Sequence, residues 1–258
     1  MNRIDRLFQE KKSGILSVYL TAGYPELGDT VPLIRSLQAY GADMVEVGIP
    51  FSDPMADGPV IQQSSHVALQ NGMNLDLLFN QIGEVRAKVT IPLVMMGYFN
   101  PIHRMGMEKF LDRCTETGID GVIIPDLPPD EFEHLYRDRF IASGIHHILL
   151  VTPQTSKERI RKIAALSSGF LYMVASASTT GARDSISRQQ EDYFQQLADM
   201  KLPLPALIGF GISSRTTFEA ACRYARGAII GSAFIEALGE EGSLESNVRN
   251  FMQRIKAG

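Results

Sequence analysis

The sequence lacks the features that mark secreted, membrane-bound and nucleic-acid-binding proteins. Its two cysteines, Cys114 and Cys222, have neither a CxxC partner nor a histidine at metal-ligand spacing, so we expect free thiols in a reducing compartment. No apolar run approaches the length of a membrane span, and the charged N-terminal segment lacks the apolar core of a signal peptide. A net charge of −4 offers no electrostatic footprint for nucleic acid or an anionic membrane. We therefore expect a cytoplasmic protein that binds neither.

The chain also lacks any sign of a domain boundary. No Pro/Ser/Gly-rich spacer, low-complexity stretch or block of like charge interrupts its 258 residues, of which 45% are hydrophobic. Glycine and proline recur at short intervals along the whole length, as they do between successive secondary-structure elements. We expect residues 1–258 to form a single domain.

A short apolar run followed by a helical pattern recurs along the chain. The apolar runs are nearly continuous in Val, Ile, Leu and Met, which is typical of parallel strands buried on both faces. They cover residues 14–20, 44–49, 91–96, 121–127, 146–152, 170–175, 205–211 and 227–231. The helical patterns cover residues 30–40, 75–88, 108–117, 130–143, 157–166, 189–200, 216–224 and 244–255.

Eight strand-helix units of this kind predict the α/β class and a single (β/α)8 barrel, the TIM-barrel architecture. We expect an extra N-terminal helix and a short helix over residues 233–238, after the eighth strand. A doubly wound sheet is the structural alternative, but it requires an early GxGxxG turn, which the first strand lacks. In a barrel, the residues that leave the carboxyl ends of the strands form one rim, where activity is expected.

Two carboxylates on this rim suggest acid/base chemistry. Glu46 lies inside an apolar strand, where a carboxylate is rarely buried unless it is paired or functional. Asp57 follows eleven residues later, behind prolines that stiffen the intervening loop. A structural ion pair could explain Glu46, although no Lys or Arg lies in the predicted strands, and Asp-Gly-Pro at Asp57 is also ordinary turn chemistry. An apolar environment would favour protonated Glu46, a usable general acid near neutral pH.

Glycine-rich turns after the seventh and eighth strands predict a phosphate site. Gly209-Phe210-Gly211-Ile212-Ser213 and Gly231-Ser232-Ala233 would let backbone N–H groups approach an anion at the start of the short helix. Plain turns without a ligand are the alternative. Thr180-Gly181, in the loop after the sixth strand, could add a contact when that loop closes as a lid.

The residue types that the predicted rim lacks exclude two classes of reaction. No lysine lies at a predicted strand end, which leaves a Schiff-base aldolase without its nucleophile. The five histidines form no metal set. With these two classes excluded, we expect acid/base chemistry without a cofactor on a phosphorylated substrate. Apolar and aromatic residues near the rim could enclose a flat hydrophobic group. They are Tyr19, Ile61, Met96, Tyr98, Tyr172 and Phe210.

The motifs resemble those of the tryptophan synthase alpha subunit family. The long segment Glu46-Val47-Gly48-Ile49-Pro50-Phe51-Ser52-Asp53-Pro54-Met55-Ala56-Asp57-Gly58-Pro59 is similar to the family signature. Further matching motifs follow the family order along the whole chain. They are Thr21-Ala22-Gly23-Tyr24-Pro25, Met96-Gly97-Tyr98-Phe99-Asn100-Pro101-Ile102, Pro125-Asp126-Leu127-Pro128, Thr180-Gly181 and Gly209-Phe210-Gly211-Ile212-Ser213.

The resemblance implies a TIM barrel that cleaves indole-3-glycerol phosphate into indole and glyceraldehyde 3-phosphate without a metal or an organic cofactor. It implies that Glu46 protonates the indole carbon at the breaking bond and that Asp57 binds the indole N–H. Tyr172 matches a tyrosine that the family places near the substrate. The implied phosphate ligands are Gly181, Gly211, Gly231 and Ser232.

The resemblance also implies a partner. The family works in an αββα complex, in which a beta subunit condenses indole with serine on pyridoxal phosphate. The implied contacts with that subunit are Pro50, Asp53, Pro54 and Asn100. One departure lies in the lid, where this chain has Ser176 and Ser178 in place of the Arg and Gly of many family members.

Two other functions stay open at this stage. Another phosphate-binding barrel enzyme, an isomerase or a ring-closing synthase, would need a base on strand six with a histidine, or lysines at strand ends, and the chain shows neither. A non-catalytic subunit that only activates a beta partner would not need both Glu46 and Asp57.

Overall fold

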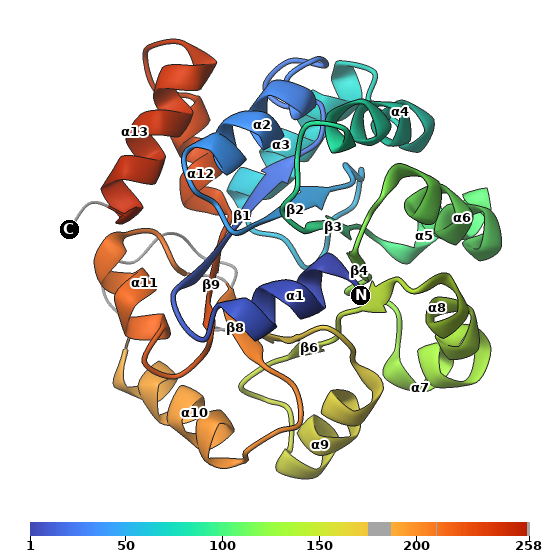
Figure 1. Ribbon diagram of the computed structural model, residues 1–258, viewed down its shortest axis with the longest axis vertical. Helices are drawn as coiled ribbons and strands as arrows, with labels where there is room; N and C mark the ends of the chain where they lie inside the picture. The colour runs from blue at the N-terminus through green and yellow to red at the C-terminus, as the bar shows by residue number, and fades with distance from the viewer. Residues whose placement is uncertain (175–186, 210, 257–258) are drawn as a thin grey trace.

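The computed structural model describes residues 1–174, 187–209 and 211–256. Its strands are β1 (Ile15–Thr21), β2 (Met44–Gly48), β3 (Leu93–Met96), β4 (Gly121–Ile123), β5 (His146–His147), β6 (Leu150–Val151), β7 (Leu171–Val174), β8 (Ala206–Gly209) and β9 (Gly227–Ile230). All of their pairings are parallel, in the order β5-β4-β3-β2-β1-β9-β8-β7-β6. The predicted barrel is confirmed, and helices form a ring around it (Figure 1).

The predicted strand over residues 146–152 is divided into β5 and β6. β5 pairs with β4, and β6 pairs with β7, the strand at the other end of the order. Between them, the Ile148 amide donates to the Val122 carbonyl at 3.0 Å and the Leu149 carbonyl accepts from the Tyr172 amide at 3.1 Å. This one segment therefore bonds to both edges of the sheet and closes the barrel, which is why its ladder changes partner halfway.

The helices that follow the predicted patterns are α2 (Thr30–Ala39), α4 (Leu75–Arg86), α6 (Met107–Thr117), α9 (Lys157–Leu166), α10 (Arg188–Asp199), α11 (Arg215–Ala221) and α13 (Leu244–Lys256). The predicted helix over residues 130–143 is also present, as α7 (Pro129–Glu131), the π-helical turn η1 (Phe132–Tyr136) and α8 (Arg137–Ser143). The expected extra helices are α1 (Arg3–Glu10) and α12 (Ser232–Leu238).

Two helices were not predicted, α3 (Pro59–Gln70) and α5 (Phe99–Met105). Polar Gln, Ser and His residues occupy positions 62–66, in the middle of α3, so its apolar stripe is weak. The sequence around Asp57-Gly58-Pro59 instead resembles a turn, although proline is well suited to the first position of a helix. α5 is short and carries Pro101 in its first turn, where a missing N–H costs little.

Two hydrophobic clusters divide the core. One contains alternate residues of successive strands, such as Met44, Val94 and Leu207, and fills the barrel. The other contains the intervening strand residues, such as Val45 and Val47, and the helix faces packed on them. This is the period-two alternation expected of barrel strands.

α1 closes the amino-terminal end of the barrel. Ile4 and Phe8 belong to the inner cluster, and the Phe8 and Phe170 rings lie 5.8 Å apart. The Asn2 side chain donates to the backbone carbonyl of Asp120, just before β4, at 2.8 Å. Figure 1 shows α1 lying across this end. The opposite end, where the strands finish, is the one left for a substrate.

The carboxylate of Asp120 ties α1 to the barrel wall. It is buried, accepts from the Leu93 amide at 2.9 Å, and pairs with Arg3 at 3.0 Å and Arg86 at 3.4 Å. Removing one member of a buried charge cluster leaves the others uncompensated.

We expect Asp120→Ala to lower the free energy of unfolding by about 3 kcal/mol in urea denaturation, because Arg86 loses its buried partner. The control is Asp130→Ala, which removes a half-exposed ion pair with Lys162 and should cost less than about 1 kcal/mol. Equal small losses in the two variants would contradict a structural role for the Asp120 cluster.

Candidate active site

Glu46 points into the barrel from the middle of β2. Its neighbours two positions away are Met44, which belongs to the inner cluster, and Gly48. Its partners across the sheet are Tyr19 on β1 and Val94 on β3, which also belong to the inner cluster. The side chain is only 2% exposed. The carboxyl group therefore lies inside the apolar filling of the barrel, below its open end.

Burial controls the protonation of Glu46. Desolvation, followed by the nearby negative charge of Asp57, raises the pKa of Glu46 from 4.5 to about 8. None of the ion pairs found in the described residues involves Glu46. The alternative of a paired structural carboxylate finds no support in this part of the chain, and the group is protonated at neutral pH.

Asp57 is held in the loop between β2 and α3 by its neighbours. Its side chain is 7% exposed, and the Tyr98 hydroxyl donates to Oδ2 at 3.1 Å. The same hydroxyl accepts from the Ala56 amide at 2.8 Å, and the Tyr98 ring stacks on Phe51 at 5.1 Å. Burial raises the pKa of Asp57 to about 6, against the opposing effect of the Tyr98 hydrogen bond. Asp57 is therefore a carboxylate at pH 7.

Sequence reasoning missed Gln62, which fixes the base of this loop. Its side-chain amide donates to the carbonyls of Asp57 at 2.9 Å and Pro54 at 3.3 Å. No signal in the sequence distinguishes it from any other exposed glutamine of a helix. It shows that the loop is held from α3 as well as by its prolines.

Three predicted aromatic residues surround the carboxyl pair. Tyr19, Tyr98 and Tyr172 are all buried. Burial and the charges of Glu46 and Asp57 raise the pKa of Tyr172 well above its ordinary value, which places this phenol beside the pair. A Cβ on Gly209 would lie 2.2 Å from the Tyr172 hydroxyl, so the ring is accommodated only because residue 209 has no side chain.

The predicted phosphate turns leave β8 and β9. Gly211 has a φ of +76°, and an added Cβ there would meet none of the described residues within 4 Å. Gly231 caps α12, whose first residue is Ser232. A Cβ on Gly231 would lie 3.6 Å from the Tyr19 Cβ, so this turn adjoins the carboxyl site. Thr180, Gly181 and Phe210, and the lid substitutions Ser176 and Ser178, lie outside the described residues.

The four predicted partner contacts separate into two kinds. Asp53 and Asn100 are exposed, whereas Pro50 and Pro54 are buried and shape the loop. Met55, at the tip of the same loop, is 91% exposed, which is unusual for a large apolar side chain.

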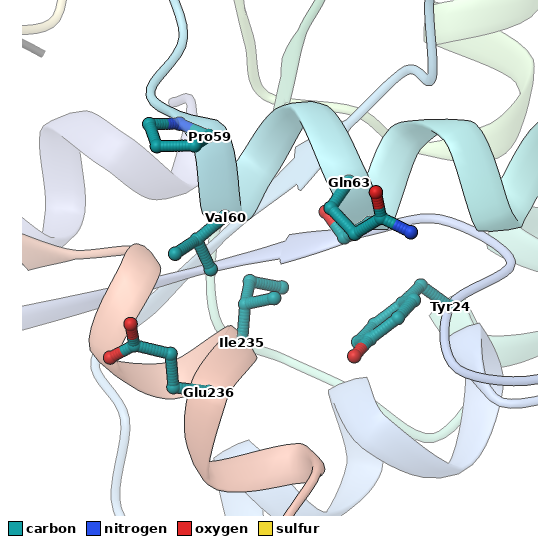
Figure 2. Close-up of a pocket in the computed structure, with 7 residues that line it drawn as sticks. Tyr24, Pro59, Val60, Gln63, Ile235 and Glu236 are labelled. Carbon is teal, nitrogen blue, oxygen red and sulfur yellow. The ribbon is translucent and has the colours of Figure 1, made fainter.

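A hollow of about 360 Å³ lies beside the rim, between α3 and α12. Figure 2 shows Val60 and Gln63 of α3 facing Ile235 and Glu236 of α12, with Tyr24 at one end. None of the predicted site residues lines it. The carboxyl site is identified instead by its buried titratable groups.

The described residues show neither a metal site nor a membrane-spanning helix. They contain no group of three or more His, Cys, Asp or Glu arranged to hold a metal ion. Every helix in the described ranges falls short of the length and apolar character needed to cross a membrane.

Comparison with known proteins identifies the family. The family model for the tryptophan synthase alpha chain matches residues 5–257. The tryptophan synthase alpha chain of Parabacteroides distasonis is 52% identical over 256 residues, which are 99% of this chain and 100% of the relative. That of Flavobacterium psychrophilum is 51% identical over 255 residues, with the same shares.

Solved structures agree with the sequence comparisons. The tryptophan synthase alpha subunit of Legionella pneumophila has a TM-score of 0.87 at 34% identity, over 99% of this chain and 98% of the other. A chain of the tryptophan synthase complex from Pyrococcus furiosus has a TM-score of 0.86 at 32% identity, over 95% and 98%. The chain therefore belongs to the tryptophan synthase alpha chain family and catalyses its alpha reaction, the cleavage of indole-3-glycerol phosphate into indole and glyceraldehyde 3-phosphate.

Proposed function

We propose that Glu46 and Asp57 are the groups with which this chain cleaves indole-3-glycerol phosphate. The observation that carries the proposal is their difference in protonation: the pKa of Glu46 is raised to about 8 and that of Asp57 to about 6. At pH 7 one group is an acid and the other a carboxylate. Two neighbouring carboxyl groups with separated pKa values are typical of acid/base catalysis.

Glu46 moves both protons of the reaction. Cleavage adds a proton to the ring carbon at the breaking bond and removes one from the hydroxyl on the adjacent chain carbon. Glu46 gives its proton to the ring carbon, which becomes tetrahedral. The resulting carboxylate then takes the hydroxyl proton while the carbon–carbon bond breaks and the aldehyde C=O forms. Glu46 is protonated again at the end, so no other proton donor is consumed.

Asp57 stabilises the intermediate charge. Protonation of the ring carbon leaves a positive charge that extends to the ring nitrogen, and a carboxylate hydrogen-bonded to the ring N–H offsets that charge. Tyr98 donates to Asp57 Oδ2 and thereby fixes the direction of the carboxylate. Tyr98 and Tyr172 form aromatic walls for the ring.

The phosphate group sets the orientation of the substrate. Backbone N–H groups near Gly211, Gly231 and Ser232 would hold it at the ends of β8 and β9, which leaves the ring over Glu46 and Asp57. Thr180 and Gly181 complete this site in our proposal, and Phe210 contacts the ring, on the resemblance of these positions to the family motif.

A beta subunit is the partner of the chain in the proposed complex. Pyridoxal phosphate belongs to that beta chain, and the alpha chain binds no cofactor of its own. Asp53 and Asn100 would contact the partner directly, while the buried Pro50 and Pro54 would hold the loop that presents Asp53 and Met55. Because the same loop carries Asp57, contact with the beta subunit can affect the alpha site. We infer that the complex works in the cytoplasm, where other reactions of amino-acid synthesis take place.

Glu46→Gln tests the proposal most simply. The variant should lower indole release from indole-3-glycerol phosphate by at least about 10²-fold, with or without a beta subunit, because glutamine cannot donate the proton. The parent chain should release indole, and Glu84→Gln, at an exposed position of α4, should match the parent. Substantial activity in folded Glu46→Gln would sink the assignment.

The same variant should change how stability depends on pH. Between pH 4.5 and about 8, folded Glu46 holds a proton that the unfolded chain has released, so the parent loses stability as the pH rises. The loss approaches ~1.4 kcal/mol per pH unit for one group. Glu46→Gln should lack this component in urea unfolding at pH 5, 6.5 and 8. Parallel stability curves for the two proteins would be incompatible with a raised pKa of Glu46.

The pH profile of kcat/KM should be bell-shaped. Activity should rise as Asp57 ionises near pH 6 and fall as Glu46 loses its proton near pH 8. In Asp57→Asn the remaining activity should lose the lower limb and keep an upper limb that moves to lower pH, because the Asp57 charge no longer raises the pKa of Glu46. A lower limb that persists in Asp57→Asn would assign it to another group.

A further inference from the structure

Tyr19 lies between the two ends of the proposed substrate site. It is paired with Glu46 across β1 and β2, so both side chains enter the barrel at the same level. A Cβ on Gly48, one inward position above Glu46, would lie 2.0 Å from the Tyr19 hydroxyl oxygen and 2.5 Å from Cζ. The phenol therefore occupies the space of the side chain that Gly48 lacks, directly above Glu46.

The other end of Tyr19 faces the predicted phosphate turn. A Cβ on Gly231 would lie 3.6 Å from the Tyr19 Cβ and 3.7 Å from Cδ1. Tyr19 thus extends from the turn after β9 to the level above Glu46. In indole-3-glycerol phosphate, the hydroxyl-bearing chain joins the phosphate to the ring. A substrate that spans these two ends passes this chain along the phenol.

The phenolic hydroxyl of Tyr19 makes one hydrogen bond in the described part of the protein, and it is long. Its partner is the Thr21 hydroxyl at 3.5 Å. The Thr21 proton is directed to the Ser64 hydroxyl at 2.7 Å, because Ser64 donates its own proton to the Ile61 carbonyl at 2.9 Å. Burial and the Asp57 charge raise the pKa of Tyr19 well above its ordinary value, so the phenol keeps its proton. Tyr19 is therefore a buried hydrogen-bond donor whose one partner in the described residues lies at the limit of hydrogen-bond distance, so a substrate oxygen can replace it.

We propose that Tyr19 is a further catalytic residue, whose hydroxyl donates a hydrogen bond to the hydroxyl oxygen on the substrate carbon attached to the indole ring. The inference rests on the proposed roles of Glu46 and Asp57. As this oxygen gives its proton to Glu46, it becomes more negative until the C=O bond forms. A donor held in place before the reaction stabilises that change and orients the hydroxyl toward Glu46.

Tyr19→Phe tests this role, with Tyr193→Phe as the matched control. Tyr193 lies on α10, where its hydroxyl is buried without a hydrogen-bond partner in the described residues. Tyr19→Phe should lower kcat/KM for indole release about tenfold, whereas Tyr193→Phe should match the parent. An analogue with hydrogen in place of the reacting hydroxyl should inhibit the parent and Tyr19→Phe with the same inhibition constant, within about twofold, because it lacks the acceptor.

Three results would overturn the proposal. One is an unchanged kcat/KM in Tyr19→Phe. Another is a loss of affinity for the analogue in Tyr19→Phe as large as the loss of kcat/KM, because the phenol would then contribute only to the fit of the indole ring. The third is a shifted lower limb of the pH profile, because the phenol would then serve Asp57. Failure of the proposed catalytic pair is recognised separately, by substantial indole release from Glu46→Gln.

Discussion

The structure depends on keeping one carboxyl group out of water without a counter-ion. Glu46 lies among the apolar side chains that fill the barrel, and no ion pair in the described residues reaches it. α1 closes the amino-terminal end beneath it, held by the Asp120 cluster, so water has no short path from that side. Burial then favours the neutral acid, which in the proposed mechanism is the source of the proton for the ring carbon. Asp57, nearer the open end and bonded to Tyr98, keeps its charge at neutral pH.

The sequence was informative where one residue conflicts with its surroundings. A glutamate inside an apolar strand identified Glu46, and the repeated apolar runs identified the barrel, because both signals are local. α3 and the pinning of the Asp57 loop by Gln62 and Tyr98 were not predicted. α3 has a weak apolar stripe, and Gln62 is a residue type that is ordinary in any helix. Tyr98 reaches Asp57 from 41 residues away, a contact that only the folded barrel brings about. The division of β5 from β6 could not be predicted either, since it follows from closure of the whole sheet. The roles of Glu46, Asp57 and the phosphate turns remain predictions, as do those of Thr180, Gly181 and Phe210, which lie outside the described residues.

Two glycines shape the site because they have no side chain. Gly48 and Gly209 are the last residues of β2 and β8, at the carboxyl ends of these strands. The phenols of Tyr19 and Tyr172 occupy the space that larger residues at these two positions would need. Tyrosine rings at these places bring hydroxyls near the carboxyl pair. The loop after β2 combines two tasks: its buried prolines and hydrogen bonds hold Asp57, while Asp53 and Met55 face outward. A partner that binds the exposed side of this loop would act on the catalytic side without a long structural path.

Direct titration of the Glu46 carboxyl group tests the central claim. Carbon-13 NMR of protein labelled at the glutamate side-chain carboxyl, with Glu46→Gln used to assign the resonance, measures its pKa in the free chain. The account predicts a midpoint near 8, well above the ordinary glutamate value of 4.5. A midpoint near 4.5 would show that Glu46 is a carboxylate at neutral pH and would contradict its role as the proton donor.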